Sequence, residues 1–154
     1  MGEPADLNYE TPRLRRAVTR LLGHETGGDG ASSEELAAAS GRLLDRLSQR
    51  LSVVIGGAGV EALFLRAVKL RKTDFPFLDE RMLSRGQDES PGDSLRTRLQ
   101  GQEADVIREM SVTLFATFAG VLATVIGERL AWSLLQDIWP DTFRSETEVQ
   151  EAEE

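Results

Sequence analysis

Residues 110–127 contain no charged side chain over the whole run MSVTLFATFAGVLATVIG. A stretch this apolar must be shielded from water, because exposing so much hydrocarbon surface is unfavourable. The shield can be other helices of the same chain, a partner subunit or a lipid bilayer. Each kind of cover implies a different class of protein, so this segment constrains the fold more than any other.

The side chains of this segment favour cover by protein over cover by lipid. On a helix, large residues such as Leu114 and Phe118 share one side, while small residues such as Ala116 and Gly120 form a seam that a second helix can approach closely. Four hydroxyl residues and two glycines weaken the preference for a bilayer, and no cluster of basic residues follows the segment. We therefore expect a helix buried in a soluble protein, with a membrane span and an oligomer interface as alternatives.

Helical periodicity dominates the rest of the chain. A capping box of Ser32 and Glu35 precedes an apolar stripe that predicts a helix up to about Ile55. The stripe consists of Leu36, Leu43, Leu47, Leu51 and Val54. The opposite face of this helix carries polar residues such as Arg42, Asp45 and Gln49.

Other helices are predicted on either side of this one. A short helix follows Pro12, and three glycines within residues 56–59 separate the capped helix from the next one, at about residues 60–72. A further helix restarts near Ser94 and continues through the apolar segment to Trp139. No alternating run is long enough for a strand, and no convincing internal repeat is visible.

These patterns predict an all-α, single-domain helical bundle of four to five helices with a long apolar C-terminal helix. Residues 1–30 are expected to form a loosely docked N-terminal helix and a glycine-rich linker. Residues 31–140 are expected to form the bundle domain, and residues 141–154 a disordered acidic tail.

Composition excludes several classes of protein. The chain has no cysteine, which removes disulfides, thiolate metal sites and cysteine nucleophiles, and its one histidine, His24, is expected in a glycine-rich loop. We therefore predict no catalytic residue, no metal ligand and no cofactor. A net charge of −8 argues against nucleic acid as a partner. The acidic start is unlike a secretory signal, and the residue usage suggests a bacterial, cytoplasmic protein.

One sequence motif resembles a cofactor-binding site and favours an enzyme instead. Residues 57–62 read G-x-G-x-x-A after the apolar run 51–55, and Asp79 and Glu80 follow about twenty residues later, as in a dinucleotide-binding turn. That interpretation requires residues 51–55 to be a strand, yet the helical stripe continues into them. A connection between two helices is the simpler interpretation, and a nucleotide-binding enzyme is kept as a distant alternative.

The function that this sequence favours is a non-enzymatic regulatory or protein-interaction domain. It would bind a protein partner, or a second copy of itself, through an apolar helix face near the end of the chain. The candidate interaction residues are Phe118, Leu122, Trp132, Leu135 and Trp139. The alternative is a membrane-associated helical protein anchored by residues 110–127.

Overall fold

The computed structural model describes residues 12–27, 30–76, 78, 90–140 and 142. These residues form six α-helices and contain no strand, which confirms the all-helical class. The helices are α1 (Pro12–Thr26), α2 (Ser33–Ile55), α3 (Gly57–Arg71), α4 (Pro91–Leu99), α5 (Ala104–Ile126) and α6 (Glu128–Ile138). The prediction of four to five helices is wrong.

The continuous helix predicted from Ser94 to Trp139 is divided at two places. Helix α4 ends at Leu99 and α5 begins at Ala104, and the chain turns again at Gly127. Gly127 has φ 97° and ψ 146°, a backbone conformation that residues with a side chain rarely adopt. Its N–H donates to the carbonyl of Ala123, and its own carbonyl accepts from the N–H of Ala131. One glycine therefore ends α5 and begins α6.

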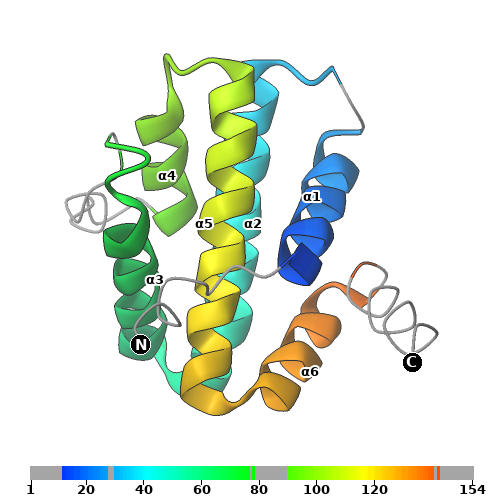
Figure 1. Cartoon of the computed structure of the whole chain (residues 1–154), viewed down its shortest axis with the longest axis vertical. Helices are drawn as coiled ribbons and strands as arrows, with labels where there is room; N and C mark the ends of the chain where they lie inside the picture. The colour runs from blue at the N-terminus through cyan, green and yellow to red at the C-terminus, as the bar shows by residue number, and fades with distance from the viewer. Residues whose placement is uncertain (1–11, 28–29, 77, 79–89, 141, 143–154) are drawn as a thin grey trace.

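The same turn occurs at Gly56, between α2 and α3. Gly56 has φ 85° and ψ 154°, donates to the carbonyl of Ser52 and accepts from the N–H of Val60. In each case the long helix before the turn has 23 residues. In Figure 1, α2 and α5 run side by side in the same direction, and α3 and α6 leave their lower ends towards opposite sides.

The described fold is therefore an internal repeat of a three-helix unit, in which α1, α2 and α3 correspond to α4, α5 and α6. The sequence analysis missed this repeat. Ser40 of α2 and Ser111 of α5 are equivalent positions, 71 residues apart, and their buried hydroxyl oxygens lie 2.5 Å from each other. Ser40 donates to the carbonyl of Leu36, so Ser111 donates to Ser40 and both buried hydroxyls are satisfied.

Helix α4 approaches α2 through two glycines. A Cβ atom added to Gly92 would lie 2.1 Å from the carbonyl oxygen of Gly41, so the contact has no room for a side chain. Asp45 accepts hydrogen bonds from the Gly92 N–H at 2.8 Å and from the Ser90 hydroxyl at 2.9 Å. The Asp45 carboxylate, on the face of α2 opposite its apolar stripe, therefore holds the N-terminus of α4.

The apolar segment lies at the centre of the described fold. Every residue from 110 to 122 is buried. Within the described part of the chain, α5 is the one helix long and apolar enough to cross a membrane, and 72% of its most apolar window is buried inside the protein. A helix that is covered by its own chain, as the sequence predicts, has to be buried in this way.

Helix α1 packs against α5 with five buried side chains: Leu14, Ala17, Val18, Leu21 and Leu22. Arg15 adds hydrogen bonds to the Thr113 hydroxyl at 3.0 Å and to the Glu109 carboxylate at 2.9 Å. The boundaries given for a separate N-terminal part stay a prediction. The predicted acidic tail lies outside the described residues except for Thr142, which is buried.

Candidate functional site

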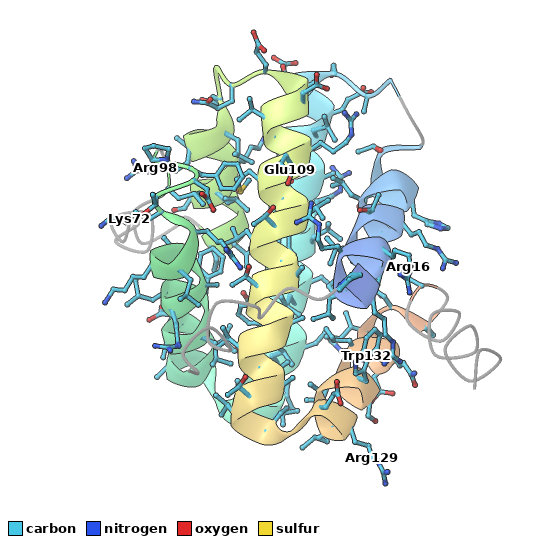
Figure 2. The ribbon with its side chains drawn as sticks, in the orientation of Figure 1. Arg16, Lys72, Arg98, Glu109, Arg129 and Trp132 are labelled. Atoms are coloured by element: carbon cyan, nitrogen blue, oxygen red, sulfur yellow. The ribbon has the colours of Figure 1, made fainter. Side chains whose placement is uncertain are left out.

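The structure buries four of the five candidate interaction residues. Phe118, Leu122, Leu135 and Trp139 all belong to the core, and the Phe118 ring lies 6.5 Å from that of Phe64 on α3. They are therefore not accessible to a partner while the fold is intact. Trp132, the fifth, is partly buried, and its ring lies 3.8 Å from the guanidinium carbon of Arg13. Figure 2 shows Trp132 on α6, below α1.

Other apolar side chains are exposed instead. Among the described residues, the exposed large hydrophobic side chains are Val53 (86%), Val54 (53%), Val125 (64%) and Leu130 (48%). They come from the last turns of α2 and α5 and the first turn of α6, next to the two glycine turns at the lower end of the molecule (Figure 1). We call these four residues the end face.

A groove of about 210 Å³ continues the end face between α2 and α6. Its lining residues are Arg50, Leu51, Val53, Val54, Leu134, Asp137 and Ile138. The lining is apolar with one cation and one anion. The volume is below the roughly 300–1,000 Å³ of typical small-molecule sites, so the groove fits one or two side chains better than a cofactor.

A second, larger cleft of about 370 Å³ lies between the N-terminus of α2 and the C-terminus of α4. Its lining residues are Ser33, Glu34, Ala37, Arg96, Leu99, Gln100 and Gly101. The ionisable members of this lining are one acid, Glu34, and one base, Arg96. The lining contains neither a histidine nor a second carboxylate.

The described residues also bear on the other chemistry considered from the sequence. No group of three or more metal-ligating side chains occurs among them. The prediction that His24 lies in a loop is wrong, because α1 continues to Thr26 and His24 is exposed on it. Residues 57–62 form the first turns of α3, and residues 51–55 end α2 as helix. The strand that a dinucleotide-binding turn requires is thus replaced by helix at this position.

Comparison of the chain with models of known protein families, with curated proteins and with solved structures finds no match. The proposals below therefore rest on the geometry of the described residues.

The sequence analysis missed the end face for a physical reason. Val54 continues the apolar stripe of α2 at helical spacing and was assigned to the core, but about half of its side chain stays exposed beside α6. Val53 offered a usable signal, because it lies on the same side of the helix as Arg42 and Gln49. A large apolar residue on a charged helix face is a candidate for a partner contact.

Proposed function

We propose that this chain is a non-enzymatic protein-interaction domain that pairs with a second copy of itself through the end face. In this proposal residues 31–140 act as one helical bundle domain in the bacterial cytoplasm. The observation that carries it is the gathering of all four exposed large apolar side chains of the described residues at one end of the molecule. Clustered apolar exposure of this kind is typical of interaction surfaces.

The charges around the end face favour a second copy as the partner. Arg50 and Arg129 lie beside it, and so do Glu128 and Asp137. In a symmetric dimer each face meets itself, so a rim with both signs can set cations opposite anions. The rim is locally neutral although the whole chain carries −8, which limits repulsion where the two copies meet.

The size of the end face sets the expected strength of pairing. Four side chains and a mixed rim cover less than the roughly 800 Å² per partner of a standard stable interface. We therefore expect a weak, reversible dimer with a dissociation constant of roughly 10–100 µM. Because such a dimer forms or dissociates with modest changes in concentration, it suits a regulatory role.

Sedimentation velocity over a range of concentrations tests the proposal. The unmodified protein is expected to sediment faster as its concentration rises through roughly 10–100 µM. Val125→Asp is expected to remove this dependence, because it places a charge in the apolar centre of the interface. Its fold should be unchanged, since Val125 is mostly exposed in the single chain.

Gln100→Glu is the matched control. It also adds one negative charge, but at an exposed position at the opposite end of the molecule, so its pairing should equal that of the unmodified protein. A protein that stays monomeric at several hundred micromolar, or pairing that survives Val125→Asp, would contradict the proposal.

A further inference from the structure

Three arginines form a row along the outer face of α2. Arg42, Arg46 and Arg50 are four residues apart, so their side chains follow one another at about 6 Å along the helix axis. All three are exposed. The row leads to Val53 and to the groove between α2 and α6, which Arg50 also lines.

Arg42, the first residue of the row, is already paired with an acidic side chain. Its Nε donates to the carboxylate of Glu25 at 3.1 Å, and one of its terminal nitrogens donates to the Glu25 carbonyl at 3.2 Å. Glu25 lies near the C-terminal end of α1, so an acidic side chain of a neighbouring helix already occupies the first position of the row. Within the described part of the chain, Arg46 and Arg50 have no hydrogen bond or ion pair.

The internal repeat shows that the same face of the second long helix is covered. Position by position, the counterparts of the three arginines on α5 are Thr113, Thr117 and Val121, and all three are buried. Thr113 accepts a hydrogen bond from Arg15 of α1, and Thr117 accepts one from Arg71 of α3 at 2.8 Å. On α5 this face is thus packed inside the protein, whereas on α2 it exposes guanidinium groups to solvent.

We propose that Arg46, Arg50 and the adjoining groove bind an acidic amphipathic helix of another protein. Two carboxylates one turn apart on that helix would meet the two guanidinium groups, as Glu25 meets Arg42. A large apolar side chain one turn further along would enter the groove beside Val53 and Leu134. This site shares Val53 and Val54 with the end face but does not use Val125 or Leu130, so its binding can be measured in a variant that does not self-associate.

The groove favours a protein partner over nucleic acid. A sugar–phosphate backbone has no apolar group to fill a pocket lined by Leu51, Val54 and Ile138, and Asp137 would repel a phosphate placed there. A helix with acidic and apolar residues on one face satisfies both parts of the site.

The experiment is a titration followed by amide chemical shifts in the full chain bearing Val125→Asp, which keeps self-association out of the measurement. The probe is a synthetic alanine-based helical peptide of about 18 residues. One face of it carries Leu, Glu, Glu and Leu at successive turns, so that it can dock in either direction. The control peptide has glutamine at both glutamate positions.

The glutamate peptide is expected to shift the amides of residues 46–54 and 134–138. Arg46→Glu combined with Arg50→Glu should weaken its binding about tenfold, because two exposed ion pairs become repulsive. Arg66→Glu combined with Lys69→Glu makes the same charge change at exposed positions of α3 and should leave binding within about twofold, since only long-range charge is altered.

Four results would overturn the inference. They are the absence of shifts at millimolar peptide, equal binding of the glutamine peptide, an equal loss in the α3 double variant, and stronger binding of a short single-stranded oligonucleotide at residues 46–54. In the Val125→Asp variant, shifts of residues 46–54 that follow protein concentration without peptide would overturn it too, because the occupant would then be a second copy.

Discussion

Gly92→Ala is expected to destabilise the protein by about 3–5 kcal/mol, a large part of the total stability of a typical domain. The added Cβ would lie 2.1 Å from the carbonyl oxygen of Gly41 and 2.5 Å from a carboxylate oxygen of Asp45. The first of these atoms is backbone in the middle of α2 and cannot rotate away. Helix α4 would have to move off α2, which strains the hydrogen bond to Asp45 and exposes Leu95 and Leu99.

Urea denaturation followed by circular dichroism measures this effect, with Gly23→Ala as the control. Gly23 lies within α1, and a Cβ added there meets no atom within 4 Å. Alanine at a position of this kind should leave stability unchanged or raise it by up to about 1 kcal/mol, because it restricts the unfolded chain and favours helix. Equal stability of the two variants would show that α4 does not approach α2 as described.

Phe118→Ala is expected to cost about 3–5 kcal/mol, the range observed when a buried aromatic ring is removed. The Phe118 side chain is only 1% exposed, and its ring packs near Phe64 of α3. Val125→Ala is the comparison truncation about two turns further along α5, where the side chain is mostly exposed. It should change the free energy of unfolding by no more than about 0.5 kcal/mol.

The same denaturation experiment checks this pair of variants. The difference between them reports which part of α5 is buried by its own chain and which part is exposed. A small effect of Phe118→Ala, together with a large effect of Val125→Ala, would reverse the assignment of core and surface on this helix.

Structural features that depend on residues close together in the sequence could be predicted from the sequence. The capping box of α2 is confirmed: the Glu35 N–H donates to the Ser32 hydroxyl at 3.1 Å, and the Ser32 N–H donates to the Glu35 carboxylate at 2.8 Å. The break after Ile55 is confirmed as well, because three glycines within four residues disfavour helix strongly. A single glycine at position 127 in an apolar run gave too weak a signal for the identical turn.

The repeat and the exposed sites depend on contacts between distant segments. Ile55-Gly56 and Ile126-Gly127 match, but the outer faces of the two long helices differ, with arginines on α2 where α5 carries threonine and valine. The two long helices therefore share few identical residues, among them Ser40 and Ser111 in the core and Val54 and Val125 near the glycine turns. Which apolar residues stay exposed is decided by where α3 and α6 pack, and periodicity within one helix does not contain that information.

Amide hydrogen exchange of the dilute protein in detergent-free buffer shows whether the uncharged segment is covered by helices of its own chain. The account predicts that residues 110–122 exchange more slowly than any other segment, and only through global unfolding. Rapid exchange of this segment in the dissolved protein, or protection that develops only when lipid vesicles are added, would contradict the account.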